Sequence, residues 1–468
     1  MIELYKDEPF VKKISALIDK NPLLWNMVMQ IGTQNIRVQS YDKLKEEWNE
    51  NVLLLITSDS YQEIYDFILK ESNNPNIVCR PYPQNYYSYT RWIQMLFRKL
   101  PLQRQLLFSA GHEPHENALA LVEYLEQEYE GKPYRVVFLG KTSKKIQTHN
   151  VKVLYLNPDT LRCKSNPMDI LLFCWLYAGS KVLFYENQPL KKWNPKQTLV
   201  FLNHGTIPMK DVHDVLGQPK EVDYALCPSK GCSDIYGLQY GIPTKKLIYA
   251  MPPRDDFLRK NMHKFDKLVD CNDRQVILWL PTFRTLKGTD RKDSTIDDTL
   301  PLIAKSEDLH TINERLRHNE QLLVIKCHPR EKNTVDIPAF YDYIKVVTDE
   351  DLANENVLLQ EILGGTTALL TDYSGIAFEY LLLDKPIGYV ISDMNSYTRG
   401  FAFENPGDYM PGIMIDTVDG LLKFLDDVKT RRDEYYDARK RLVTKIFQGN
   451  ESKSGAQELM GQLKERIL

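Results

Sequence analysis

The feature that most constrains the fold is the alternation of short apolar segments with longer segments of helical periodicity. Short apolar runs separated by helices are typical of parallel sheets covered by helices on both faces. In the first half we predict strands at 51–58, 104–111, 134–141, 151–157, 180–186 and 197–205, with helices at 59–70, 116–129 and 168–179. In the second half we predict strands at 274–283, 321–329, 367–374 and 385–391, and a helix at 375–384.

The length of 468 residues indicates more than one domain. Prolines and charges in AMPPRDDF (250–257) would break any element, so we place the main boundary there. The predicted parts are a small N-terminal α/β module at 1–100, a first doubly wound domain at 104–250, a second at 251–440 and a C-terminal helical tail at 441–468. The charged segment TRRDEYYDARKRLVTKIF (430–447) is interpreted as one long helix that crosses back.

Composition excludes several classes of protein. A formal net charge of −3 argues against a nucleic-acid partner, because nucleic-acid-binding domains are usually strongly basic. The seven cysteines include no CxxC pair, which disfavours a zinc site and suits a reducing cytosol. The N-terminus lacks a signal-peptide pattern, and the longest apolar run (168–179) is too short to span a bilayer. The GxGxxG and GxxxxGK[ST] motifs are absent. These features predict a cytoplasmic protein.

One stretch has an unusual local charge. No acidic residue occurs between Glu71 and Glu113, and RWIQMLFRKLPLQRQ (91–105) combines basic residues with apolar ones near helical spacing. A basic amphipathic helix of this kind can lie on an anionic membrane surface. The alternative is an ordinary helix that packs on a core and turns its basic face to solvent.

Polar and cationic residues follow four of the predicted strands. Ligands of open α/β sheets bind beyond the carboxyl ends of the strands. The residues at these four ends are His204; Thr282 and Arg284; Lys326, His328 and Arg330; and Thr371, Asp372, Tyr373 and Ser374. We therefore expect one shared cleft between two domains.

The segment TDYSGIAFEYLLLDKP (371–386) suits an anion at the front of a helix. Helix N-termini offer unpaired amides and a partial positive charge. Thr371 and Ser374 add hydroxyl donors, and Gly375 would let the backbone approach a phosphate closely. The alternative is that Asp372 or Ser374 merely caps the helix.

Two further strand ends carry cations. KCHPR (326–330) places Lys326 and His328 where they could neutralise or protonate a phosphate, although a surface basic cluster would give the same pattern. LPTFR (280–284) offers Arg284 as a bidentate clamp. In NHGT (203–206), His204 could act as a general base toward a hydroxyl, or could be a hydrogen-bonded structural histidine.

Taken together, these segments resemble the CDP-glycerol glycerophosphotransferase family of teichoic acid and capsule primases and polymerases. The resemblance covers about residues 105–450 and rests on motifs in order. They are LFSAGHEPHENALALVEYL (107–125), LNHGTIPMK (202–210), MPPRDDFL (251–258), LPTFR, IKCHP, TDYSGIAFEYLLLDKPIGY (371–389) and RGFAFENPGDYMPG (399–412).

The resemblance implies a GT-B transferase with two Rossmann-like domains. Such enzymes move an alditol phosphate from a CDP-alditol to a hydroxyl of a lipid-linked or polymer acceptor and release CMP. It also implies a peripheral position on the inner face of the bacterial cell membrane, to which 91–105 could contribute. No cofactor or metal is expected, and the oligomeric state is open.

Residue roles follow from the same resemblance. His204 would be the base on the acceptor side, and His328 would contact the donor phosphates. The expected phosphate-binding set is Thr371, Ser374, Gly375, Lys326, Arg284 and Arg399. Asp255 and Glu379 depart from the family pattern and are assigned to recognition of donor or acceptor. Asn203 also departs from it, because it replaces a tryptophan. The sequence does not choose between glycerol and ribitol.

Two other functions stay open at this point. A GT-B glycosyltransferase would use the same phosphate site for a nucleotide sugar and release UDP or GDP. A non-catalytic scaffold of a capsule assembly complex would keep the fold and lose the chemistry. The presence of His204, His328 and Ser374 disfavours the scaffold.

Overall fold

The structure is a computed structural model of the 468-residue chain. Its contacts divide the chain into one unit of residues 1–100 with 158–175, and a second of 101–157 with 176–468. The described residues are 17–18, 28–31, 34–40, 42–43, 54–56, 79–81, 96–110, 115–128, 134–140, 146–161, 166–187, 189–213, 222–260, 262–282, 284, 300–303, 305–328, 335 and 337–467.

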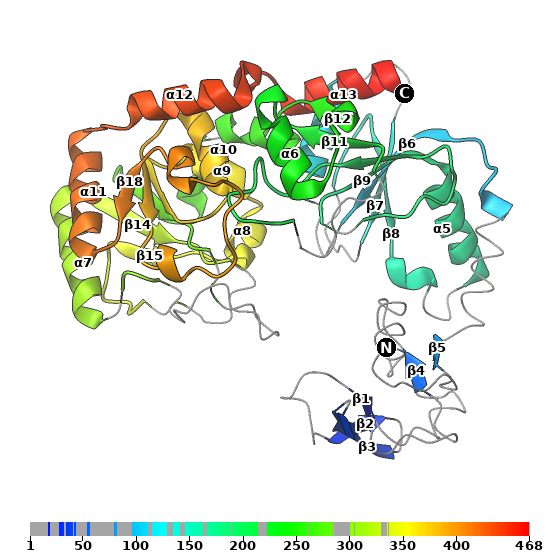
Figure 1. Cartoon of the computed structure of the whole chain (residues 1–468), viewed down its shortest axis with the longest axis horizontal. Coiled ribbons are helices and arrows are strands. Elements are labelled where there is room, and N and C mark those ends of the chain that lie inside the picture. Colours follow the sequence, from blue (N-terminus) through cyan, green and yellow to red (C-terminus); the bar gives the residue numbers. More distant parts are fainter. Residues whose placement is uncertain are drawn as a thin grey trace. The chain divides into compact units, whose positions relative to one another are not determined.

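A seven-stranded parallel sheet occupies the first half of the second unit (Figure 1). Its strands, in spatial order, are β12 (Leu247–Tyr249), β11 (Tyr224–Cys227), β10 (Thr198–Phe201), β9 (Ser180–Tyr185), β6 (Gln103–Ser109), β7 (Arg135–Leu139) and β8 (Lys152–Leu156). All of its neighbouring pairs are parallel. Side chains such as Leu106, Val182 and Val200 are completely buried, as apolar residues are in a sheet covered on both faces.

A six-stranded parallel sheet follows. Its strands, in spatial order, are β15 (Ile344–Val346), β14 (Gln321–Ile325), β13 (Gln275–Trp279), β16 (Ala368–Thr371), β17 (Ile387–Val390) and β18 (Ile413–Ile415). All of these pairs are parallel as well. The chain changes direction at the centre, between β13 and β16, so the polar segments that follow these strands share one edge. The predicted α/β class with two Rossmann-like domains is confirmed for the described residues.

Helices connect the strands. The α-helices are α4 (Glu116–Gln127), α5 (Pro167–Gly179), α6 (Ser233–Tyr240), α7 (Ser306–Asn319), α8 (Asp349–Glu355), α9 (Leu359–Gly365), α10 (Ile376–Tyr380), α11 (Val418–Thr430), α12 (Tyr436–Phe447) and α13 (Gly455–Arg466). The 3₁₀ helices are η4 (Pro158–Leu161), η5 (Lys230–Cys232), η6 (Thr244–Lys246), η7 (Pro253–Arg259), η8 (Met262–Lys267), η9 (Leu381–Leu383), η10 (Met394–Ser396), η11 (Pro406–Tyr409) and η12 (Asn450–Ser452).

The N-terminal part contains short strands. β1 (Leu17–Ile18), β3 (Gln34–Gln39) and β2 (Val28–Ile31) form one sheet, and β4 (Leu54–Ile56) pairs in parallel with β5 (Cys79–Pro81). β4 falls within the strand predicted at 51–58. The helix predicted at 59–70 lies outside the described residues.

The prediction of one helix over 430–447 is wrong. Arg431 adopts a left-handed conformation (φ 55°) that ends α11, and α12 begins only at Tyr436. Figure 1 shows α12 running along one side of the second sheet toward the first, where α13 lies. Ala456, Leu459, Met460 and Leu463 of α13 belong to the core of the first sheet. The chain therefore does cross back, but it uses two helices.

A helix that continues to residue 105 is also wrong. Residues 96–97 are helical, a turn closes with the Leu100 amide donating to the Phe97 carbonyl (3.1 Å), and β6 begins at Gln103. Pro101 explains the break, because it has no amide to continue a helix. Residues 91–95 lie outside the described part.

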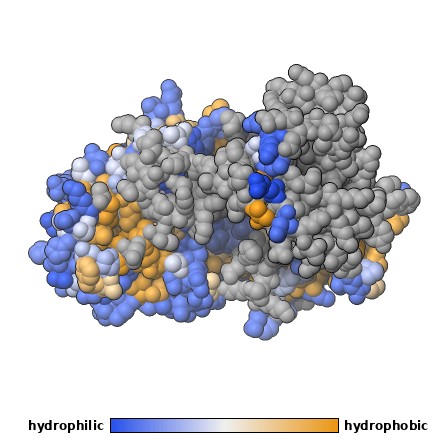
Figure 2. Space-filling model, turned by 90° about the horizontal axis from the view of Figure 1, so that it is seen from below, coloured by the Kyte–Doolittle hydropathy of each residue, from blue (hydrophilic) through white to orange (hydrophobic). Residues whose placement is uncertain are grey.

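No helix among the described residues is long and apolar enough to cross a membrane. Exposure of apolar side chains is local. Seen from below in Figure 2, the described atoms at the left show a hydrophobic patch bordered by hydrophilic residues. Leu96 and Met168 of the first unit are 70% and 67% exposed.

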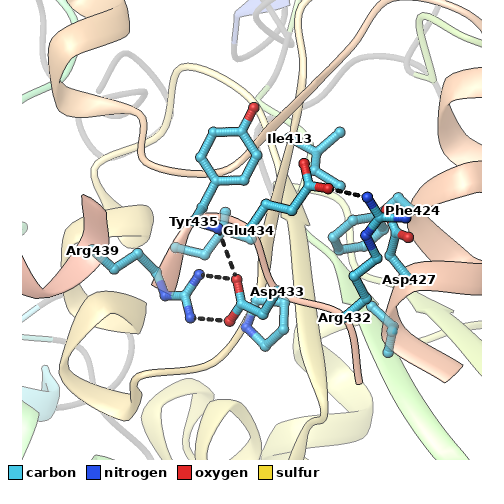
Figure 3. Close-up of a pocket in the computed structure, with 11 residues that line it drawn as sticks. Ile413, Phe424, Asp427, Arg432, Asp433, Glu434, Tyr435 and Arg439 are labelled. Atoms are coloured by element: carbon cyan, nitrogen blue, oxygen red, sulfur yellow. Dashed lines mark hydrogen bonds and ion pairs between the residues drawn. The ribbon is translucent and has the colours of Figure 1, made fainter. Parts of the chain in front are cut away.

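Beside β17 and α11, a cavity of about 10 Å³ is closed by ionic contacts (Figure 3). The buried Arg439 guanidinium faces both carboxylate oxygens of Asp433, and Arg432 contacts Glu434 at the rim. A space of this size holds at most a water molecule. This cavity is thus no ligand site, and we interpret the Arg439–Asp433 pair as an anchor for the start of α12.

Candidate functional site

His204 follows β10 on a turn that its predecessor fixes. Asn203 adopts a positive φ of 62°, which asparagine tolerates better than most residues. Its side chain donates to the Tyr240 hydroxyl (3.1 Å) and accepts from the His204 amide (2.8 Å). Asn203 stands where the resemblance noted from the sequence would place a tryptophan, and here the asparagine shapes the turn that presents His204.

The His204 imidazole is solvent-exposed but lies among protein atoms and cations. Desolvation, followed by the charges of Arg254, Arg399, His328 and Lys210, lowers the pKa of His204 to about 4. The ring is therefore neutral at physiological pH. A neutral imidazole can accept a proton, which a general base must do.

The segment after β10 joins the loop that follows β17. Lys210 and Phe401 form an antiparallel bridge. Beside it, the Ala402 amide donates to the Met209 carbonyl (2.9 Å), and the Asp211 amide donates to the Gly400 carbonyl (3.2 Å). The Arg399 guanidinium donates to the Asp211 carbonyl (3.0 Å). These contacts bring Arg399 from the second sheet's domain to the His204 segment of the first.

Gly375 marks a second close approach of the two domains. A Cβ at this position would lie 2.8 Å from the carbonyl oxygen of Ile207, closer than carbon and oxygen can stand. The glycine thus allows the loop after β16 to lie against the His204 loop. Ser374 is partly exposed beside it, and its Oγ lies 3.5 Å from the Ile376 amide.

A buried polar network runs beneath His204. Arg254 of η7 donates to the His204 carbonyl (2.6 Å) and contacts the Glu379 carboxylate, which also accepts from Gln360 (3.2 Å). The Arg254 amide donates to Asn117 Oδ1 (3.1 Å). Arg254 and Glu379 are at most 6% exposed. This ion pair links the two domains directly under the candidate base.

Asp255 and Glu379, predicted for substrate recognition, are buried in this network. Burial, together with the neighbouring Glu379 charge, raises the pKa of Asp255 well above its usual range. Its Oδ2 lies 3.5 Å from the Thr206 hydroxyl. Both oxygens of Glu379 contact protein groups. In this structure both acids therefore lie in positions that support the His204 loop.

Arg284 lies under the TDYS loop and is completely buried. Its guanidinium contacts Asp372 (2.5 Å) and Asp393 (2.8 Å), and it donates to the Thr282 carbonyl (2.6 Å). Burial opposes ionisation of Asp372, but Arg284 and Lys210 outweigh it, and the pKa of Asp372 lies below its usual range. Arg284 therefore holds the loops after β13, β16 and β17 together, and its role as a direct phosphate clamp stays a prediction.

The other predicted phosphate ligands differ in position. Thr371 is buried and donates its hydroxyl to the Leu280 carbonyl (3.0 Å), so it ties β16 to β13. Lys326 is 6% exposed and pairs with Asp349 (2.7 Å). His328 is exposed at the end of β14, near enough to act on the charge of His204. The groups that the structure brings together at an accessible place are His204, His328, Ser374, Gly375 and Arg399.

The predicted helix at 375–384 is a five-residue α-helix, Ile376–Tyr380, followed by η9. Such a short helix has little dipole to offer an anion. The positive potential of the site comes mainly from the side chains of Lys210, Arg254 and Arg399.

Comparison with known proteins identifies the family. The family model for CDP-glycerol:poly(glycerophosphate) glycerophosphotransferase matches residues 93–459. The chain belongs to this family. The glycerophosphotransferase family was expected from the motif order, and that expectation is confirmed, as is the transferase class.

Relatives in this glycerophosphotransferase family act on teichoic acids. The chain is 24% identical to the teichoic acid glycerol-phosphate primase of Bacillus subtilis, over 60% of this chain and 73% of that one. It is 24% identical to the teichoic acid poly(glycerol phosphate) polymerase of Bacillus spizizenii, over 77% and 93%. It is similar at the same identity to a poly(ribitol-phosphate) polymerase of that species, over 58% and 45%.

The fold agrees with that of a solved teichoic acid polymerase. A structure of the wall teichoic acid polymerase TagF matches 86% of this chain and 96% of its own, with a TM-score of 0.60 at 16% identity. This likeness shows the shared fold.

Sequence reasoning did not select two residues at the site. Arg254 lies within the motif MPPRDDFL, and Lys210 ends LNHGTIPMK. An arginine between two prolines and two aspartates was a usable signal, because a buried arginine needs nearby carboxylates. Which carboxylate it would meet depends on the distant Glu379.

Proposed function

We propose that this chain transfers an alditol phosphate from a CDP-alditol to a hydroxyl of a teichoic-acid-type polymer precursor and releases CMP. The observation that carries the proposal is a neutral His204 surrounded by Lys210, Arg254, Arg399 and His328, within a chain of the CDP-glycerol glycerophosphotransferase family. Its relatives include glycerol-phosphate and ribitol-phosphate polymerases.

His204 would take the proton of the acceptor hydroxyl. The hydroxyl oxygen then forms a bond to the phosphorus that carries the alditol, and the bond from that phosphorus to the CMP oxygen breaks. The lowered pKa of His204 keeps the ring neutral, as a proton acceptor must be, and it also makes the ring a weaker base than a free imidazole. CMP departs with the electron pair of the broken bond and an added negative charge.

The surrounding cations would stabilise that charge. Arg399 and His328 are the predicted neighbours of the donor phosphates, with the Ser374 hydroxyl and the Gly375 amide beside them. Positive groups fixed in place before the reaction lower the barrier where charge develops. We further propose that this set of side chains makes a metal ion unnecessary. Transfer should then persist after dialysis against EDTA.

We propose that the acceptor is lipid-linked or polymeric and that the chain works at the inner surface of the cell membrane. Leu96 is 70% exposed and stands next to the exposed Arg98 and Lys99. Apolar and basic side chains together suit an anionic bilayer surface. Co-sedimentation with phosphatidylglycerol vesicles, lost at high salt, tests this proposal.

The donor is tested before the acceptor is known. Thermal unfolding is measured with CMP, CDP-glycerol, CDP-ribitol, UDP and UDP-sugars. A ligand that binds only the folded chain raises the melting temperature as its concentration exceeds Kd. We expect CMP and one CDP-alditol to stabilise the wild type, and we expect Ser374→Ala and His328→Ala to lose much of the effect.

The matched control is Ser452→Ala, a serine in η12 whose hydroxyl donates to the Gly449 carbonyl (3.4 Å). This variant should respond to CDP-alditols as the wild type does. Stabilisation by UDP species alone would overturn the proposal in favour of a glycosyltransferase. If the His204→Ala variant released CMP as fast as the wild type, His204 would not be the general base.

A further inference from the structure

A groove of about 380 Å³ lies between the loop at 407–412 and α12, apart from His204. Its residues are Gly407, Asp408, Met410, Pro411, Gly412, Met414, Tyr435, Ala438, Arg441, Leu442 and Lys445. We call it the α12 groove. Its volume falls in the range of small-molecule sites.

The α12 groove has an apolar floor and a cationic rim. Met410 and Leu442 are 1% and 5% exposed, so they form a floor of hydrocarbon. Arg441 and Lys445 stand at its edge, exposed and four residues apart on α12. Side chains at this spacing are neighbours on one helix face, where two like charges repel each other.

Two other cations of α12 have carboxylate partners, whereas among the described residues Arg441 and Lys445 have none. Arg439 is paired with Asp433, and Lys440 with Asp384 (2.9 Å). Arg441 has no ion-pair partner among the described residues. Lys445 lies 4.6 Å above the Tyr409 ring and donates to its hydroxyl (3.3 Å), but has no carboxylate partner in the described part of the chain. An anion between Arg441 and Lys445 would relieve their repulsion.

One loop connects the α12 groove to the candidate site. The segment that carries Arg399 continues through Phe403. The Phe403 ring stacks on the Tyr409 ring, with 3.7 Å between the ring centroids. Phe403 also lies 6.1 Å from Phe378, in the helix that follows Ser374 and Gly375. A chain that extends from the site along this loop would meet the α12 groove.

We propose that the α12 groove binds the alditol-phosphate chain of the acceptor, and this rests on the proposed function. A repeating alditol phosphate has three kinds of group, and the groove offers a partner for each. Its phosphodiesters would contact Arg441 and Lys445, its carbon backbone would lie on Met410 and Leu442, and its hydroxyls would donate to Asp408. The α12 groove then holds acceptor chain beyond the reacting end.

The test measures binding of soluble, fluorescently labelled poly(glycerol phosphate) and poly(ribitol phosphate) by anisotropy. We expect the wild type to bind one of them, with an affinity that falls as salt rises. Arg441→Ala and Lys445→Ala should each weaken binding about tenfold, and the double variant more. Lys440→Ala is the matched control, since it removes a cation of the same helix that lies outside the groove, and should change affinity less than about twofold.

Thermal shift with the CDP-alditol on the same preparations separates the two proposals and reports folding. The groove variants should keep the wild-type melting temperature and the wild-type donor shift. Unchanged polymer affinity in the double variant, or no polymer binding by the wild type, would overturn the proposal that the α12 groove binds the acceptor chain. A melting-temperature shift with the CDP-alditol would still support the proposed transferase function. The proposal would also be overturned if the double variant lost binding to phosphatidylglycerol vesicles but kept its affinity for polymer, because the groove would then bind a lipid surface.

Discussion

At the scale of single residues, neighbours decide what each polar group can do. His204 has cations around it and is neutral, whereas Arg284 has two carboxylates around it and is fully enclosed. Both had been predicted to act directly on substrate. Because burial and pairing differ between them, we propose a direct role for His204 and a supporting role for Arg284.

The pH dependence of transfer should reflect the His204 surroundings. The pKa of His204 falls from 6.5 to about 4, so its neutral form persists as pH drops through 6.5 and is lost only near 4. The acid limb of kcat/KM that belongs to His204 should therefore lie well below pH 6.5. Arg399→Ala should move it upward, since a nearby positive charge is removed.

Initial rates of CMP release across pH measure this limb. Arg317→Ala serves as the control, because Arg317 is an exposed arginine paired with Glu314 (3.1 Å). It should leave the limb in place. An acid limb near 6.5 in the wild type, unmoved in Arg399→Ala, would contradict the assignment.

Removing Arg284 should destabilise the second domain strongly. Arg284→Ala leaves Asp372 and Asp393 buried without their cation, which typically costs about 3–5 kcal/mol. Arg432→Ala removes an exposed arginine paired with Glu434 and should leave the urea midpoint nearly unchanged. Equal midpoints for the two variants would show that the Arg284 cluster is not a determinant of stability.

At the scale of elements, the candidate site is formed by loops that follow parallel strands, and the loops after β10 and β16 lie in close contact. Gly375→Ala would place a Cβ 2.8 Å from the Ile207 carbonyl, so the loops after β10 and β16 would have to separate. We expect CMP release to fall by about tenfold or more, because small displacements of reacting groups are costly. The chain should remain folded.

Gly461→Ala is the matched control for this loop. A Cβ at Gly461, inside α13, meets nothing within 4 Å, and alanine favours a helix. Its activity should equal that of the wild type, and its melting temperature should be equal or higher. Full activity in Gly375→Ala would show that the loops tolerate separation.

At the scale of the whole molecule, the C-terminal helices complete the first domain. Asp256, next to Arg254, accepts from the Ser454 hydroxyl (2.7 Å) and from the amides of Gly455 (2.8 Å) and Ala456 (3.2 Å), so it caps α13. α13 then packs its apolar face on the core of the first sheet. The domains are thus joined twice, at the His204 loop and through this helix.

Leu459→Ala should destabilise the first domain although it lies close to the end of the chain. The leucine is completely buried in that core, and such truncations cost about 2–5 kcal/mol. Leu238→Ala is the control, because Leu238 is 74% exposed on α6. Urea unfolding should show a lower midpoint for Leu459→Ala only. A shared midpoint would mean that α13 is dispensable.

The sequence by itself determined the central strands, their parallel arrangement and the family, because buried apolar runs and ordered motifs are local patterns. It missed β11, β12, β15 and β18, which have only three or four residues each and little periodicity. It also started the helix of 430–447 too early, because α12 begins only at Tyr436, after the left-handed Arg431. Only the tertiary structure decided which polar residues meet. Arg254 finds Glu379, and Arg284 finds Asp372 and Asp393, across 88 to 125 positions of sequence, and burial depends on such distant contacts.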